Sequence, residues 1–433
     1  MQLQKMTNAR SIRSGAGAIH YGWIVAAITF LTLLAAAGAR AAPSVMILPI
    51  CNEFKWSRAT VSSVISINIF LYGLVGPFAA SLYQTLGLRK SMIGAMLMIG
   101  LGYGLSVYAT HYWQFVLLWG LMVGIGSGTA ATVLGAAVAN RWFDTHRGLV
   151  MGMLTASTAT GQLIFLPCLA WIVTTRGWRG APLVVVGAAA LALPLIWFFM
   201  RDRPADLGIR PFGEKGPARD AVLVSGNPAR RAITVLSQAV RVRDFWLLAG
   251  SFFICGASTN GLIGTHLVSA AFDCGIPEVR SASLLAMMGV FDLFGTTLSG
   301  WLSDRFNCRY LLFVYYGLRG ISLLFLPRAL VGPSAGLAVF AVFYGLDWIA
   351  TVPPTVRLAS DVFGCETGGI VFGWVVAAHQ LGAAFAAYAA GVLRTTAGAY
   401  TLAFLAAGGL CLVAAILVIP IRRPAAVAMG APA

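Results

Sequence analysis

Charged side chains are scarce in this chain. Asp, Glu, Lys and Arg together make up 10% of its 433 residues, whereas an average soluble domain has about 25%. Hydrophobic residues make up 59%, and apolar runs of about 18 residues or more recur along the sequence. The scarcity of charge excludes an ordinary soluble protein, and the long apolar runs predict transmembrane helices. They also exclude a membrane β-barrel, because its short spans alternate apolar and polar residues.

Acidic residues are scarcer still, at 14 against 30 basic ones, which gives a formal net charge of +16. A nucleic-acid-binding protein would gather such an excess on one face of a soluble domain. Here the basic residues lie in short loops between apolar runs, so the positive-inside rule for membrane proteins explains the excess. We therefore predict no nucleic-acid partner.

Sequence motifs for catalysis, metal binding and nucleotide binding are missing. The seven cysteines are scattered without CxxC or CxxH spacing, which argues against a disulfide framework and a metal site. The sequence has no Walker or GxGxxG motif in the right context, and no His, Asp and Glu cluster has catalytic or metal-ligand spacing. We expect no enzyme activity, no cofactor and no metal ion.

The apolar runs can be drawn as twelve spans. One long polar interval separates six spans from six, which is typical of duplicated helix bundles. The predicted fold is therefore all-α and integral to the membrane, with two pseudo-symmetric six-helix bundles at 1–200 and 244–433 and a cytoplasmic linker at 201–243. The predicted spans are 21–50, 58–83, 88–109, 113–140, 147–175, 180–200, 244–272, 281–303, 309–328, 334–360, 368–395 and 398–420.

Lys and Arg are distributed unevenly between the two sides of the membrane. The side that holds both termini, the linker and the loops after spans 2, 4, 8 and 10 has 21 of them, and the opposite side has seven. Because basic loops are retained in the cytoplasm, this bias predicts that both termini and the linker are cytoplasmic.

Four charged residues lie deep inside the spans: Arg40, Asp292, Arg319 and Asp347. A charge at bilayer depth is costly unless it faces protein, water or a partner, so such residues are candidates for function. Acids in this position serve proton relays in many transporters, and we predict proton coupling by Asp292 or Asp347. Because buried charges need partners, we predict that Arg319 forms a structural ion pair with one of the two acids.

Arg40 lies in the outer half of the first span, and no acid accompanies it in the first six spans. The planar guanidinium group is suited to bidentate capture of a carboxylate, so we predict that Arg40 binds a substrate anion. Two alternatives are snorkelling of the side chain to the outer surface and pairing with an acid across the cleft between the two predicted helix bundles.

Uncharged polar residues inside the spans complete the set of candidates. A lone polar residue in a span more often makes an interhelical hydrogen bond than a ligand contact, and that alternative stays open for each of them. His379 has the further property of titrating near neutral pH. The substrate-binding candidates besides Arg40 are Asn68, Gln162, Asn260 and His379.

The loop after the eighth span reads Gly300-Trp-Leu-Ser-Asp304-Arg305-Phe-Asn-Cys-Arg309. It resembles the G-x-x-x-D-R-x-G-R loop motif of the major facilitator superfamily. The resemblance implies a role in cytoplasmic gating for Gly300, Asp304, Arg305 and Arg309. The equivalent loop after the second span lacks the Asp-Arg pair.

Further segments resemble the bacterial monocarboxylate-porter-like branch of that superfamily, over nearly the whole chain. The resemblance implies a multi-pass transporter of the bacterial inner membrane, an acid for proton coupling at Asp292 and a cationic residue near Arg40 at the carboxylate site. Those porters carry an arginine four residues after the acid, whereas this chain has Thr296 there. The segments are Tyr21-Gly22-Trp23, Glu53 to Ala59, Arg141-Trp142-Phe143, Gly177-Trp178-Arg179 and Arg201 to Pro211.

Together these features predict a monomeric secondary transporter that works by alternating access in the lipid bilayer. Its expected partners are a small organic anion, a monocarboxylate in our interpretation, and protons. No ATP-binding motif is present, so ion gradients or exchange must supply the energy. The two acids and the apolar cavity also allow an efflux pump for hydrophobic or cationic compounds. A transporter-like sensor is a third interpretation, and it would require an added signalling domain.

Overall fold

The computed structural model describes residues 20–214, 228–332 and 334–422, and every regular element in these ranges is a helix. The elements of the first half, in chain order, are α1 (Tyr21–Phe54), α2 (Arg58–Thr85), α3 (Leu88–Ser106), α4 (Tyr112–Phe115), the π-helical η1 (Val116–Val123), α5 (Gly124–Thr129), α6 (Thr132–Trp142), α7 (Arg147–Arg176) and α8 (Gly180–Phe199). A short 3₁₀ turn, η2 (Pro204–Leu207), follows.

In the sequence, helix α9 (Pro228–Ala239) separates the two halves. The elements of the second half are α10 (Arg243–Gly256), the π-helical η3 (Ala257–Ile263), α11 (Gly264–Asp273), α12 (Glu278–Ser303), α13 (Cys308–Val331), α14 (Ser334–Asp347), α15 (Val352–Phe363), α16 (Cys365–Ala397) and α17 (Thr401–Leu417).

Each of the twelve predicted spans coincides with one helix or with consecutive helices of this list. Within the described residues, ten helical stretches are long and apolar enough to cross a membrane. The other two spans are the 19-residue α3 and the 17-residue α17. Helices of this length extend about 26 to 28 Å, close to the thickness of the hydrocarbon core.

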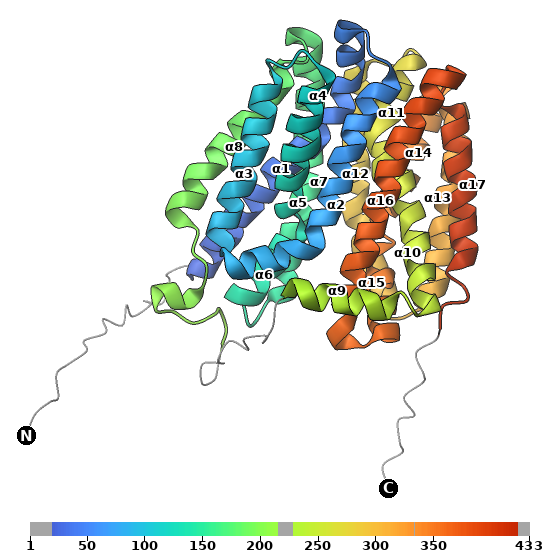
Figure 1. The fold of residues 1–433 in the computed structure, drawn as a ribbon. Helices are drawn as coiled ribbons and strands as arrows, with labels where there is room; N and C mark the ends of the chain where they lie inside the picture. Colours follow the sequence, from blue (N-terminus) through green and yellow to red (C-terminus); the bar gives the residue numbers. More distant parts are fainter. Residues whose placement is uncertain (1–19, 215–227, 333, 423–433) are drawn as a thin grey trace, which may run out of the picture.

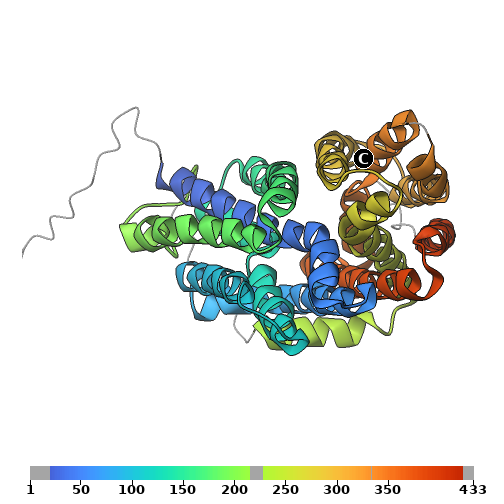
Figure 2. The same ribbon diagram turned by 90° about the horizontal axis from the view of Figure 1, so that it is seen from above.

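The helices form two groups that follow the order of the chain (Figures 1 and 2). Contacts between the groups are made chiefly by α2 with α16, by α7 with α12 and by α1 with α11. The start of α1 and the end of α17 lie at the same end of the molecule (Figure 1), which we call the terminal side.

On the terminal side, α9 runs across both groups of helices and contacts α2 and α16 (Figure 1). Its side chains Ala232 and Val235 are buried, and the Trp374 indole N–H donates a hydrogen bond to the Ala232 carbonyl at 3.0 Å. From its composition this stretch is expected only to be part of the polar linker. The domain boundaries at 200 and 244 stay a prediction.

On the opposite side, two polar clusters explain several of the loop motifs. Glu53, at the end of α1, accepts hydrogen bonds from the Trp178 indole N–H at 2.6 Å and from Arg179 at 2.8 Å. Asp273, at the end of α11, pairs with Arg58 of α2 at 3.3 Å and with Arg394 of α16 at 2.7 Å. The second cluster therefore joins the two halves on this side.

Candidate functional site

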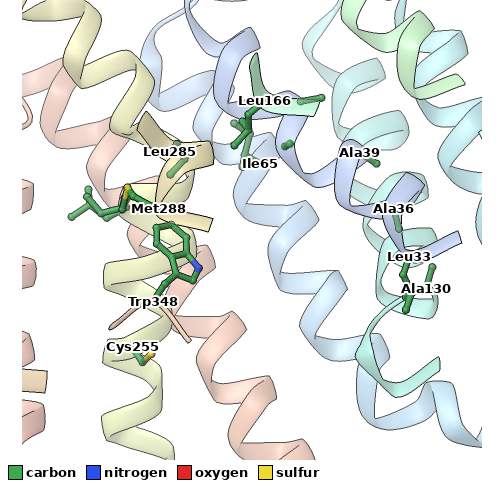
Figure 3. Packing of buried hydrophobic residues seen from close by; sticks show 14 of the residues in the cluster. Leu33, Ala36, Ala39, Ile65, Ala130, Leu166, Cys255, Leu285, Met288 and Trp348 are labelled. Carbon is green, nitrogen blue, oxygen red and sulfur yellow. The ribbon is translucent and has the colours of Figure 1, made fainter. Parts of the chain in front are cut away.

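A small cavity of about 80 Å³ lies between the two halves of the molecule. It has room for several water molecules or a small organic solute. Four of the five predicted substrate-binding residues line it: Arg40 of α1, Asn68 of α2, Gln162 of α7 and Asn260 of η3. Figure 3 shows the apolar part of the wall, with Leu285 and Trp348 of the second half on one side and Ile65 and Leu166 of the first half on the other.

Arg40 is the only charged residue among the described residues that line the cavity. Its Nη1 donates a hydrogen bond to the Tyr72 hydroxyl at 3.2 Å, and its guanidinium carbon lies 5.2 Å from the centre of the Tyr72 ring. The structure gives it no carboxylate partner within the described ranges. A guanidinium group has five N–H donors, so most of the hydrogen-bonding capacity of Arg40 is available to a solute.

Close helix packing places these side chains around the cavity. A side chain at Gly161 of α7 would collide with Ala37 of α1, so the glycine lets the two helices meet directly beside Arg40. In the same way, a Cβ at Gly128 of α5 would lie 2.8 Å from the Tyr72 carbonyl. Small residues in the fourth span therefore let α2 approach closely.

Carboxamide groups line the same cavity as Arg40. The Asn68 side-chain nitrogen donates to the Trp119 carbonyl at 2.6 Å, which fixes the amide and leaves its oxygen as an acceptor. The structure assigns no side-chain hydrogen bond to Gln162 or Asn260 within the described residues, and Gln380 of α16 adds a fourth carboxamide to the lining. These groups supply donors and acceptors for the polar atoms of a solute.

His379 does not line the cavity, although it was a substrate-binding candidate. Successive residues of a helix point about 100° apart, and it is the neighbouring Gln380 that reaches the cavity. The His379 ring packs instead against Phe252 of α10, with ring centres 4.8 Å apart, and its buried Nδ1 has no hydrogen-bond partner among the described residues.

Two aromatic residues of the lining, Tyr72 and Trp348, were not predicted from the sequence. Aromatic side chains in membrane spans usually pack against other helices or form the interfacial belt. Tyr72 lies one helical turn beyond Asn68, so the spacing of four residues was a signal for it. Trp348 lies in a break between α14 and α15, and only the folded chain shows that this break faces the cavity.

The charged residues that lie deep in the spans of the second half are Asp292, Arg319 and Asp347. They do not line the cavity, and each has partners. Arg319 is fully buried and its Nε lies 2.6 Å from Asp347 Oδ2. Asp292 is 4% exposed, and its Oδ1 accepts hydrogen bonds from the Thr296 hydroxyl and from the Ile349 backbone N–H, both at 2.9 Å. The structure thus brings these charges together beside the break in the tenth span.

The motif loop after α12 makes contacts on the terminal side within its own half. Gly300 stands in the last turn of α12, and Asp304 pairs with Arg357 of α15 at 2.8 Å. Arg305 stacks on Trp301 at 3.9 Å. Arg309 donates to the carbonyls of Ile419 and Ile421, beyond the end of α17, at 3.1 Å each.

The sequence profile of the Major Facilitator Superfamily matches residues 28–387 and 284–429 of this chain. The chain belongs to the Major Facilitator Superfamily. The predicted fold, an all-α membrane protein with twelve spans in two six-helix bundles, is confirmed, and so is the prediction of a transporter rather than an enzyme.

Curated relatives include two superfamily members of nearly equal length. The uncharacterized MFS-type transporter YcxA of Bacillus subtilis (strain 168) is 26% identical over 385 residues, covering 88% of this chain and 90% of the relative. Monocarboxylate transporter 13 of Rattus norvegicus is 28% identical over 397 residues, covering 90% of this chain and 87% of the relative.

Solved superfamily structures share the fold at lower sequence identity. The crystal structure of a D-xylose-proton symporter superposes with a TM-score of 0.71 at 16% identity, covering 94% of this chain and 99% of that one. The inward open conformation of the xylose transporter XylE from E. coli gives a TM-score of 0.70 at 17% identity, covering 94% and 98%.

Proposed function

We propose that this superfamily member carries a small organic anion, a monocarboxylate, across the membrane together with a proton. The observation that carries the proposal is the state of Arg40: among the described residues it is the single cation that lines a small cavity between the halves, and its only hydrogen-bond partner there is a tyrosine hydroxyl. A cation at bilayer depth is stabilised by an opposite charge, and a carboxylate would supply that charge with two parallel hydrogen bonds.

The chemistry of the cavity favours an anion over the alternative of a cationic efflux substrate. A cation would have to enter beside the Arg40 guanidinium, where no acid lines the wall within the described residues. The names of the relatives agree with a carboxylate, because monocarboxylate transporters 11, 12 and 13 align over most of this chain at 23 to 28% identity. The apolar wall formed by Leu285, Trp348 and Leu166 suits the carbon chain of an organic acid.

Asp292 and Asp347 are the proposed proton carriers. Thr296, which stands where the related porters have arginine, donates its hydroxyl to Asp292 at 2.9 Å. A neutral neighbour leaves the Asp292 carboxylate without a cation one turn away, and the anion-binding role falls to Arg40 on the other half. In this proposal the anion is held by the first half and the proton by the second.

The cellular setting is part of the proposal. The excess of Lys and Arg on the terminal side supports a cytoplasmic location for both termini, with the protein as a multi-pass component of the bacterial inner membrane.

The proposal is tested by uptake into proteoliposomes that contain the purified protein, with radiolabelled acetate, pyruvate and L-lactate as probes. We expect an inward proton gradient to drive accumulation of at least one probe, and a protonophore to abolish it. Asp292→Asn should lose gradient-driven accumulation while keeping exchange of labelled for unlabelled probe. Asp361→Asn, which changes an exposed acid of α15, is the matched control and should behave as the wild type.

Two outcomes would contradict the proposal. Uptake that is the same with and without the gradient would exclude proton coupling. If Asp292→Asn and Asp347→Asn both kept gradient-driven accumulation, neither acid would carry the proton. A thermal-shift screen of organic acids against amphipathic cations gives an independent answer, because a ligand that binds the folded state raises its unfolding temperature.

A further inference from the structure

The tenth span is interrupted in the middle of the membrane-crossing segment. α14 ends at Asp347, α15 begins at Val352, and residues 348–351 form turns. The interruption follows from Pro353 and Pro354, because a proline inside a helix lacks the N–H donor and its ring clashes with the carbonyl four residues before it. Both prolines are tolerated where they stand, in the first turn of α15.

A helix break at bilayer depth leaves backbone groups without helical partners, and each must be satisfied inside the protein. Arg319 of α13 satisfies two of them. Its Nη2 donates to the carbonyl of Asp347 and, at 3.2 Å, to the carbonyl of Trp348. The ion pair between Arg319 and Asp347 is therefore only part of what this arginine does.

Two residues of α12 satisfy further groups of the break. Asp292 accepts the Ile349 N–H at 2.9 Å, and the Ser299 hydroxyl donates to the Ala350 carbonyl at 2.5 Å. These two side chains are seven residues apart, so they lie on the same face of the helix. α12 thus holds the break through one acceptor and one donor.

The close approach of α12 to the break depends on a glycine. A Cβ at Gly295, between Asp292 and Ser299, would collide with the Leu346 backbone carbonyl. The missing side chain lets the backbone of α12 contact the end of α14, and this contact is what puts Asp292 within hydrogen-bond distance of Ile349.

The break carries Trp348 into the cavity. Trp348 is 8% exposed and lines the cavity opposite Leu166 and Ile65 (Figure 3). Its own carbonyl is held by Arg319, and the next residue is held by Asp292. We propose that Arg319, Asp292 and Ser299 are positioning residues that fix the break in the tenth span and thereby set Trp348 as a wall of the substrate cavity.

This role rests on the proposed function only in that the cavity is the substrate site. The identity of the solute does not enter, and Asp292 takes part through its oxygen as a hydrogen-bond acceptor. That distinction allows a test, because asparagine keeps an acceptor oxygen but cannot carry a proton, whereas alanine removes both.

The test is amide hydrogen exchange of the full-length protein in lipid nanodiscs, read by mass spectrometry on peptides that cover residues 345–355. We expect Asp292→Ala to speed exchange at the break by about tenfold or more, the effect of losing one hydrogen bond to a charged group. Asp292→Asn should stay within about threefold of the wild type. Ser299→Ala should also speed exchange, and Ser299→Thr should restore it. Ser283→Ala removes an exposed hydroxyl of α12 that bonds its own helix and is the matched control.

Quenching of tryptophan fluorescence by acrylamide reads the position of Trp348. The Trp348 signal is the difference between each variant and the same variant carrying Trp348→Phe. We expect stronger quenching in Asp292→Ala and Ser299→Ala but not in Asp292→Asn. Unchanged exchange in both alanine variants would overturn the proposal, as would an Asp292→Asn variant that exchanges as fast as Asp292→Ala. Neither readout uses a solute, so a failure here is distinguishable from a failure of the proposed transport.

Discussion

The fourth and tenth spans occupy equivalent places in the two halves, and both are broken. In the fourth span α5 ends at Thr129 and α6 begins at Thr132, and the buried Tyr83 hydroxyl donates to the freed Thr129 carbonyl. In the tenth span the corresponding task falls to Arg319 and Asp292. One freed carbonyl of the fourth span is therefore bonded by a neutral hydroxyl, whereas in the tenth span a guanidinium and a carboxylate bond the freed backbone groups.

A second difference between the halves is whether their buried charges already have ion-pair or backbone partners in the protein. Within the described residues, Arg40 of the first half makes one hydrogen bond, to a neutral group, and lines the cavity. Arg319, Asp347 and Asp292 in the second half are bound to one another or to backbone. A charged side chain with unused N–H donors can bind a ligand, whereas charged side chains that hydrogen-bond backbone groups position a segment of the chain. If this division holds, substitutions in the second half should affect stability most, and the loss of the Tyr72 hydroxyl beside Arg40 should have the smallest effect.

Arg319→Met should destabilise the protein most. The change leaves the Asp347 carboxylate buried without its cation and two carbonyls without a donor, and breaking a buried ion pair costs about 3–5 kcal/mol. Thermal unfolding of purified protein in detergent measures the loss. The double change Arg319→Met with Asp347→Leu should recover part of it, because the stranded charge is removed. Arg328→Met, at an exposed position near the end of the same helix, is the control. If Arg319→Met alone were as stable as that control, the ion pair would contribute nothing to the stability of the protein.

Tyr83→Phe should have a smaller effect on the same measurement. It removes one neutral hydrogen bond to the Thr129 carbonyl, and leaving a buried acceptor unpaired costs about 1–3 kcal/mol. If Tyr83→Phe destabilised the protein as much as Arg319→Met, the two breaks would be held with equal strength and the comparison between the halves would fail.

Tyr72→Phe should have the smallest effect. Among the described residues, the phenol hydroxyl is the one hydrogen-bond partner of the Arg40 guanidinium, and its loss releases a further N–H donor toward the cavity while the ring stays in place. We expect the affinity for a carboxylate probe to change by less than about fivefold, since a neutral hydrogen bond contributes about 0.5–1.5 kcal/mol. A loss of binding as large as that from an Arg40 variant would make Tyr72 a primary ligand.

The sequence was sufficient for the spans and for the charges at depth, because both depend on hydropathy alone. The twelve apolar runs coincide with helices, and four polar candidates, Arg40, Asn68, Gln162 and Asn260, share one cavity. Helical spacing within one span did not show which face of α16 meets the cavity, so His379 was chosen where Gln380 lines it.

Contacts between spans could not be read from one sequence. That Arg319 and Asp292 reach the backbone of the tenth span depends on how α12 and α13 pack against α14. The amphipathic helix α9 lies in a stretch of polar composition, so hydropathy did not predict it. Which of its residues are buried depends on its contacts with α2 and α16. The Pro353-Pro354 pair is visible in the sequence, but its consequence for Trp348 required the structure.

Equilibrium binding of acetate, pyruvate and L-lactate to the purified protein, with and without Arg40, tests the central claim most directly. We predict that at least one of these acids binds the wild type, that Arg40→Gln weakens its binding by about tenfold to a hundredfold, and that Arg40→Lys gives an intermediate affinity. Arg176→Gln, at an exposed position at the end of α7, should bind as the wild type does. An Arg40→Gln protein that is folded and binds the acid with unchanged affinity would contradict the assignment of the anion to Arg40.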